Sequence, residues 1–199
     1  MRVISGKARG KKLKSPPRAR PLTDRAKEAL FNILQGRIEG IRFLDLFAGS
    51  GAVGIEALSR GAAQVVFVEQ NRQAVRVIKQ NLENTGLGQA SGIMPQEVGK
   101  ALKLLRTQGK RFDIIFLGAP YDSPDLEQAL EFLGEDGLIK EAGLVIAEHR
   151  RQHKIAAEYG RLNSVRETRY GETVLTFYRM TEPASEPCLP AGTARASLE

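Results

Sequence analysis

Three glycines and a following glutamate are spaced along residues 45–69 in a pattern that could bind a nucleoside. Gly49, Gly51 and Gly54 come after an apolar run in the G-x-G-x-x-G spacing, which lets the backbone approach a bound nucleotide closely. Glu69 ends the next apolar run about 20 residues on, where a carboxylate can accept hydrogen bonds from a ribose diol. We therefore expect a nucleoside site at the carboxyl ends of two neighbouring strands.

Asp45, which precedes these glycines, discriminates between two cofactors that use such loops. A carboxylate beside the loop repels the pyrophosphate of a nicotinamide dinucleotide but attracts the cationic methionine end of S-adenosylmethionine. The sequence therefore favours a sulfonium cofactor over the dinucleotide of an oxidoreductase. The alternative is a tight turn in which Asp45 has only a structural role.

The basic charge of the chain is concentrated at its N-terminus. The chain carries 30 Lys and Arg against 23 Asp and Glu, and its first twenty residues hold eight basic groups and no acid. Basic side chains bind phosphates whatever the base sequence, so we expect residues 1–22 to form an arm that contacts RNA. The alternative is a solvated tail that only raises the isoelectric point. The candidate RNA-binding residues are Arg2, Lys7, Arg9, Lys11, Lys12, Lys14, Arg18 and Arg20.

Short apolar runs alternate with helical patterns after residue 41, which predicts an α/β fold with a mostly parallel sheet. Before them, glycines and alternating residues predict a β-hairpin within the basic arm, and the apolar spacing from Ala26 to Leu34 predicts an amphipathic helix. Proline and small polar residues dominate 181–199, so we expect a disordered tail after one domain of residues 23–180. The predicted strands are 41–47, 65–68, 112–117 and 144–148, the predicted helices 52–60, 72–84 and 125–133, and the predicted C-terminal hairpin 162–168 with 172–178.

Several blocks that occur in a fixed order give the chain a resemblance to one family. Asp45-Leu46-Phe47-Ala48-Gly49-Ser50-Gly51 follows the blocks Arg20-Pro21-Leu22-Thr23-Asp24-Arg25 and Leu30-Phe31-Asn32-Ile33-Leu34, and Arg166–Thr173 lies further on. With these blocks, residues 1–180 resemble the bacterial RsmD-type methyltransferases, which methylate N2 of a guanine in 16S ribosomal RNA. The resemblance implies a Rossmann-like class I methyltransferase fold, with a mostly parallel seven-stranded sheet and an antiparallel C-terminal hairpin. It also implies S-adenosylmethionine as the methyl donor.

The resemblance assigns residues to the cofactor as well. It places the glycine loop around the cofactor and Glu69 on its ribose. After the third strand, Gln96 and Glu97 stand where the family usually has an acidic residue. The expected cofactor-binding residues are Asp45, Phe47, Gly49, Ser50, Gly51, Glu69, Gln70, Gln96 and Glu97.

The sequence departs from the family at the expected catalytic position. Where amino-directed methyltransferases have Asp or Asn, Pro, Pro and an aromatic residue, this chain has Gly118-Ala119-Pro120-Tyr121. Acceptors for the hydrogens of an exocyclic amino group turn its lone pair toward the methyl group, and one positioned dipole is worth about 10²- to 10³-fold in rate. The backbone carbonyls of Gly118 and Ala119 remain as acceptors here, and Tyr121 can stack on a flipped base.

Three interpretations of this departure stay open. In the first, Gly118 simply permits a bend at the strand end and has no catalytic meaning, and in the second the protein is a slow or altered enzyme. In the third, the position has been substituted in a protein that still binds RNA and cofactor. We expect methyl transfer to persist, by direct transfer from sulfur to nitrogen, because the surrounding residues are intact. One alternative is a catalytically impaired RNA-binding or assembly factor that keeps the cofactor pocket. Another is a DNA amino-methyltransferase, which the lack of a sequence-recognition domain disfavours.

Composition limits the cofactors and the cellular location that we expect for the protein. Cys188 is the single cysteine, so we expect no disulfide framework and no covalent cysteine intermediate, and His149 and His153 lack metal-ligand spacing. No apolar run approaches the ~20 residues that a membrane-spanning helix needs. We expect a cytoplasmic monomer without a metal, whose partner is 16S ribosomal RNA, the small ribosomal subunit or an assembly intermediate.

Overall fold

The apolar runs form the strands of one sheet, and the amphipathic stretches form the helices that cover it. The computed structural model describes residues 1–17, 22–120, 123–135 and 137–181. The helices are α1 (Asp24–Ile33), α2 (Ala52–Ser59), α3 (Arg72–Thr85), α4 (Val98–Thr107) and α5 (Asp125–Gly134), with a short 3₁₀ helix η1 (Gly88–Ala90). The strands are β1 (Arg42–Leu46), β2 (Gln64–Val68), β3 (Ser91–Met94), β4 (Phe112–Leu117), β5 (Ile139–Arg150), β6 (Glu158–Tyr159), β7 (Leu162–Tyr170) and β8 (Thr173–Met180). None of the helices in these described ranges is long and apolar enough to cross a membrane.

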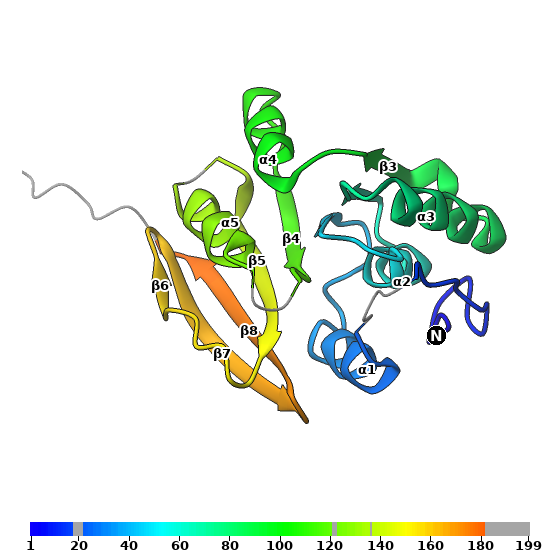
Figure 1. Ribbon diagram of the computed structural model, residues 1–199, viewed down its shortest axis with the longest axis horizontal. Coiled ribbons are helices and arrows are strands. Elements are labelled where there is room, and N and C mark those ends of the chain that lie inside the picture. The colour runs from blue at the N-terminus through cyan, green and yellow to red at the C-terminus, as the bar shows by residue number, and fades with distance from the viewer. Residues whose placement is uncertain (18–21, 121–122, 136, 182–199) are drawn as a thin grey trace, which may run out of the picture.

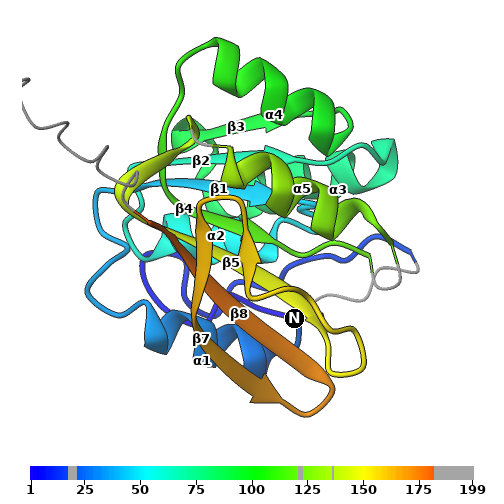
Figure 2. The same cartoon turned by 90° about the vertical axis from the view of Figure 1, so that its left-hand side faces the viewer.

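The strands within the described residues form one eight-stranded sheet in the order β3-β2-β1-β4-β5-β8-β7-β6 (Figure 2). The first five strands in this order, β3, β2, β1, β4 and β5, run parallel, because a helix crosses over between each strand and the next along the chain. The last three strands continue the sheet in antiparallel orientation. The predicted α/β fold, with its mostly parallel sheet and antiparallel C-terminal hairpin, is confirmed.

The sheet has eight strands instead of the seven expected because of the two-residue β6. Glu158 and Tyr159 pair with the start of β7, and the Tyr159 hydroxyl accepts a hydrogen bond from the Ala156 N–H at 3.0 Å. The Tyr159 and Tyr178 rings meet edge-on with 5.9 Å between centroids, and the Tyr178 hydroxyl donates to the Ala156 carbonyl at 2.7 Å. The strand therefore depends on tertiary contacts and leaves no alternating pattern in the sequence.

Two groups of helices cover the two faces of the sheet (Figure 1). α1, α2 and α3 pack on one face against Phe43, Phe67 and Phe116 of the central strands. α4 and α5 pack on the other face, against Leu46 and Leu117. In such a doubly covered sheet the carboxyl ends of the parallel strands stay open, which is where open α/β sheets bind ligands.

The N-terminal segment, residues 1–14, folds back on itself and covers α2. Its backbone makes one antiparallel bridge, between Arg2 and Lys12. Every residue of α2 is buried, because the sheet lies on one side of this helix and the N-terminal segment on the other (Figure 1). The predicted hairpin is therefore a loop with one bridge that belongs to the core of the domain. The side chains it buries there are Val3, Ala8 and Leu13.

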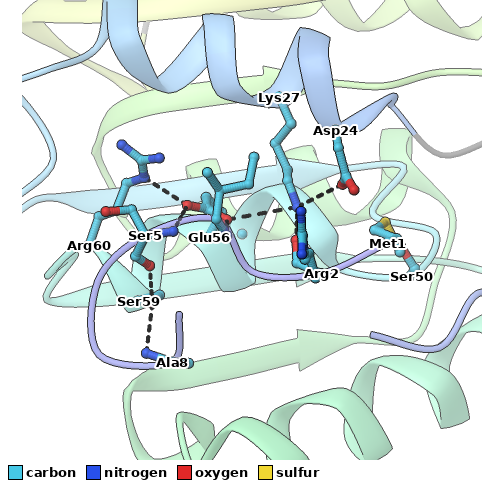
Figure 3. A network of polar contacts seen from close by, with 12 residues as sticks. Met1, Arg2, Ser5, Ala8, Asp24, Lys27, Ser50, Glu56, Ser59 and Arg60 are labelled. Carbon is cyan, nitrogen blue, oxygen red and sulfur yellow. Dashed lines mark hydrogen bonds and ion pairs between the residues drawn. The ribbon is translucent and has the colours of Figure 1, made fainter. Parts of the chain in front are cut away.

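A buried glutamate holds the N-terminal segment against α1 and α2. The Glu56 carboxylate accepts hydrogen bonds from the Ile4 and Ser5 N–H groups at 2.7 and 3.0 Å. Lys27 Nζ lies 3.7 Å from the same carboxylate and donates to the Arg2 carbonyl at 2.7 Å (Figure 3). Both charged side chains are fully buried, and burial lowers the pKa of Lys27 while the neighbouring carboxylates oppose that shift. The segment is thus fixed by charge-assisted bonds inside the protein.

Candidate active site

A cavity of about 940 Å³ opens at the carboxyl ends of the parallel strands. The loops after β1, β2, β3 and β4 contribute to its wall, together with residues of α4, α5 and β5. The structure brings most of the expected site residues together here. Those that line the cavity are Asp45, Phe47, Gly49, Ser50, Glu69, Gln70, Gln96, Glu97, Gly118, Ala119 and Pro120.

A few expected residues do not line the cavity. Gly51 has a φ of +73° directly before α2, so it turns the chain into the helix but does not reach the cavity wall. Tyr121, Arg18 and Arg20 lie outside the described residues.

Two carboxylates hold the glycine loop. Asp45 Oδ2 accepts a hydrogen bond from Gly54 N at 2.9 Å, and Glu69 Oε2 accepts one from Gly49 N at 2.8 Å. Phe47, which lies between Asp45 and Gly49 in the sequence, has a φ of +58°. This left-handed conformation costs a residue other than glycine about 1–3 kcal/mol. Such strain persists only where the surrounding structure fixes it, and it is concentrated at ligand sites. The loop is therefore held in one bent shape at the cavity wall.

Asp45 is 2% exposed, and its environment controls its charge. Burial raises the pKa of Asp45 to about 8; the Gly54 N–H opposes the rise, and the Glu69 and Glu148 carboxylates add to it. The side chain is therefore mostly protonated at neutral pH in the protein alone. A cation beside Asp45 would favour the ionised form, so cation binding and loss of this proton are coupled.

Gln96 contributes a buried hydrogen-bond donor to the cavity. Its Nε2 atom is buried without a hydrogen-bond partner among the described residues, although Gln96 lines the cavity. A buried amide without a partner costs about 1–3 kcal/mol, so this atom suits a ligand that brings an acceptor, such as a ring nitrogen of a purine. Glu97 also lines the cavity, but its carboxylate pairs with Lys100 at 3.4 Å and both side chains are largely exposed.

The tips of β4 and β5 form the part of the cavity where the expected catalytic motif lies. β4 pairs with β5 in register up to Leu117 and Ala147, so Gly118 and Glu148 follow side by side. A Cβ atom built on Gly118 would lie 3.5 Å from Glu148 Oε2 and 3.2 Å from Phe116 Cε1. The backbone of Gly118 has no positive φ, so its conformation does not require a glycine.

Sequence reasoning missed several residues of the cavity. The most notable is Glu148 of β5, which is 8% exposed and lines the cavity. The signal available was an acidic residue that closes the apolar run from Leu144 to Ala147. Further lining residues that were missed are Leu22, Lys100, Lys103, Phe132 and Arg150.

The basic residues of the N-terminal segment are exposed, and the segment is tied to the glycine loop. Asn81 of α3 joins the two, because its Nδ2 donates to the Lys14 carbonyl at 3.0 Å and to the Ser50 carbonyl at 2.9 Å. The segment that could bind RNA and the loop that could bind a cofactor therefore share one anchor. The exposed basic residues of the segment are Arg2, Lys7, Arg9, Lys11, Lys12 and Lys14.

Of the two histidines singled out in the sequence, His149 lies within β5 and His153 in the turn after it, where its Nε2 is 3.4 Å from Glu127 Oε1. His149 is buried, with Nδ1 within 3.0 Å of the Arg150 and His153 carbonyls and Nε2 at 2.9 Å from Thr176 Oγ1. Since carbonyls only accept, Nδ1 carries the proton and Nε2 accepts from the threonine. Across the described part of the chain, no group of three or more His, Cys, Asp and Glu side chains could hold a metal ion.

The sheet and its cavity define the class of the protein. A parallel sheet of order β3-β2-β1-β4-β5 that continues into an antiparallel hairpin, with a glycine loop after β1 and an acidic residue after β2, is the Rossmann-like class I methyltransferase fold. Within that class, the chain belongs to the family described as Conserved hypothetical protein 95, whose model matches residues 1–179. The match confirms the family that the sequence blocks indicated.

Named relatives and a solved structure cover most of the chain. The protein named Ribosomal RNA small subunit methyltransferase D from Escherichia coli K12 is 32% identical over 181 residues, which cover 90% of this chain and 89% of the relative. The protein of that name from Haemophilus influenzae is 36% identical over 151 residues, with 74% and 78% covered. A solved structure of a hypothetical protein from Thermus thermophilus matches with a TM-score of 0.80 and 37% identity, covering 90% of this chain and 99% of the other.

Proposed function

We propose that this protein transfers a methyl group from S-adenosylmethionine to the exocyclic N2 amino group of a guanine in 16S ribosomal RNA. The observation that carries the proposal is one continuous cavity, which is lined both by the glycine loop after β1 and by residues at the tips of β4 and β5. The family, and relatives named as small-subunit ribosomal RNA methyltransferases, support the substrate class.

The residues of the cavity suit the parts of the cofactor. Backbone N–H groups of Gly49 and Asn71 donate to the two carboxylate oxygens of Glu69 and fix their orientation. The remaining lone pairs of these oxygens can accept hydrogen bonds from two ribose hydroxyls. Gln96 would offer its unpartnered amide to the adenine, and Asp45 would face the cationic methionine end. S-adenosylmethionine, when bound, supplies a methyl group activated by a positively charged sulfur.

The acceptor base would enter beside the tips of β4 and β5. A guanine in folded RNA reaches such a cavity only after it is extruded from its stack. The carbonyls of Gly118 and Ala119 are acceptors for amino hydrogens there, and Pro120 and Phe132 offer apolar surface to the base. The new bond joins N2 directly to the methyl carbon, without a covalent intermediate on the protein.

The exposed basic face of the N-terminal segment would hold the phosphates around the extruded base. Because Val3, Ala8 and Leu13 of this segment are buried in the core, deleting the segment would damage the fold as well as RNA binding. Charge-removing substitutions at exposed Lys11 and Lys12 test RNA contact without that damage.

The test is methyl transfer to small ribosomal subunits that lack the modification. The protein is incubated with labelled S-adenosylmethionine and either assembled subunits or deproteinised 16S RNA, and the product is mapped by mass spectrometry of RNA fragments. We expect one guanine to gain a methyl group on N2. Glu69→Ala should lose most of this activity through weaker cofactor binding, whereas Glu83→Ala on the exposed side of α3 should not.

Two results would overturn the proposal. Methylation at another atom or base would refute the guanine-N2 assignment. Tight cofactor binding without any methyl incorporation into either substrate would instead indicate a factor that binds RNA but does not catalyse transfer.

A further inference from the structure

Glu148 occupies the neighbourhood that a side chain at position 118 would otherwise fill. Its Oε2 atom lies 3.5 Å from the position of a Cβ atom built on Gly118, which is ordinary van der Waals contact. The two residues follow the last paired residues of adjacent parallel strands, so their side-chain directions fall on the same face of the sheet. Glu148 lines the cavity although it is 8% exposed. A carboxylate thus reaches the site where this chain has no side chain of its own at the tip of β4.

The chemistry of an amino acceptor gives that carboxylate a use. The lone pair of an exocyclic amino group is shared with the ring, and a hydrogen-bond acceptor on one of its hydrogens localises the pair on nitrogen. The nitrogen also gains positive charge as its bond to the methyl carbon forms. A carboxylate stabilises that charge better than a backbone carbonyl does, because its hydrogen bond is charge-assisted.

We propose that Glu148 is the catalytic acceptor for the amino group of the substrate base, and that it acts from β5 in place of a side chain at the tip of β4. This inference rests on the proposed function of the cavity. As N2 forms its bond to the methyl carbon, the methyl–sulfur bond breaks and sulfur keeps the electron pair. Glu148 accepts a hydrogen bond from N2 and takes up one amino proton, which then passes to water.

The position of Gly118 makes a reciprocal experiment possible. Its backbone conformation accepts an L-residue, and the nearest obstacle to a Cβ atom is the ring edge of Phe116 at 3.2 Å, which must give by a few tenths of an ångström. An aspartate introduced at position 118 would point at the site that Glu148 serves. The set is therefore wild type, Glu148→Gln, Gly118→Asp and the double variant, with Glu141→Gln as a control on the exposed part of β5.

Single-turnover methyl transfer to small ribosomal subunits, with saturating S-adenosylmethionine, measures the step itself. We expect Glu148→Gln to slow it about 10²-fold, with a thermal midpoint close to wild type, since the amide keeps the size of the side chain. Adding Gly118→Asp to this variant should restore at least about tenfold, and Glu141→Gln should match wild type.

The outcomes separate this inference from the function on which it rests. If wild type transfers methyl groups and Glu148→Gln transfers them within about threefold of its rate, the role of Glu148 is overturned and the function stands. A double variant no faster than Glu148→Gln also overturns the role, because a purely structural glutamate would not be replaced by a carboxylate on β4. If wild type transfers no methyl group to any RNA substrate, the proposed function falls, and this role falls with it.

Discussion

The affinity of the protein for S-adenosylmethionine should rise with pH, because Asp45 must lose a proton to face a cation. With a pKa of about 8, about 1% of Asp45 is ionised at pH 6 and about half at pH 8. If the ionised form is the one that binds, the apparent affinity rises about 50-fold between these values. Above about pH 8 the rise levels off, since the carboxylate is then ionised before the ligand arrives.

Titration calorimetry in two buffers of different ionisation enthalpy measures this coupling directly. At pH 7 the binding of S-adenosylmethionine should release about 0.9 proton from Asp45. The uncharged nucleoside 5′-methylthioadenosine lacks the methionine end and should release almost none. Asp45→Asn removes the proton of the protein while the ligand's own ionisation remains, so the difference between the two proteins isolates Asp45. The same pH dependence in wild type and Asp45→Asn would refute the reasoning.

The same proton gives a readout without any ligand. The unfolded chain releases the Asp45 proton near the ordinary pKa of 3.8, whereas the native protein keeps it up to about pH 8. Between these values the native state binds more protons than the unfolded state, so the contribution of this group to the free energy of unfolding falls as pH rises. Asp45→Asn, which keeps an acceptor for the Gly54 N–H, should therefore gain stability over wild type as the pH is raised from 5 to 8. Urea unfolding at several pH values checks the sign.

Three further substitutions test the packing and the RNA-contacting face. Gly54→Ala places a Cβ atom 2.3 Å from Phe67 Cε1, so it should lower the free energy of unfolding by about 1–3 kcal/mol, and an unchanged urea midpoint would contradict this packing. Glu56→Ala leaves Lys27 buried without its main counter-charge, so it should cost about 3–5 kcal/mol in the same assay; a loss below about 1 kcal/mol would mean that the ion pair is not buried as described. Lys12→Ala should weaken RNA binding and reduce the slope of log affinity against log salt by about 1, with cofactor affinity unchanged; an unaltered slope would remove Lys12 from the RNA contacts.

The elements with local signals could be predicted from the sequence. β4 spans residues 112–117 as predicted, because an unbroken apolar run of that length fits a strand buried on both faces. α4 was missed although Val98, Ala101, Leu102 and Leu105 place its buried residues at helical spacing. β3, which precedes this helix, is a weak edge strand that contains Gly92, so no clear strand pattern marks where the helix begins.

The parts of the site that depend on tertiary pairing could not be predicted in the same way. The glycine loop and Glu69 belong to one strand-loop-helix-strand unit, so spacing alone brings them together. Glu148 joins Gly118 only through the register of β4 with β5, and these strands are separated in sequence by α5. The burial of Val3, Ala8 and Leu13 was also unforeseen, because their five-residue spacing matches neither a helix nor a strand.

The docking of the N-terminal segment on α2 and α3 has a consequence for the order of folding. During synthesis this segment leaves the ribosome before the side chains that bond to its backbone, which lie 51 to 72 residues further along the chain. Until Glu56, Asn81 and Asn84 have been made, its N–H and C=O groups can bond only to water or to transient partners. Because synthesis proceeds at about 5–20 residues per second, the basic segment of a nascent chain has no docking site for several seconds. During that time it lies within reach of the ribosome's own RNA.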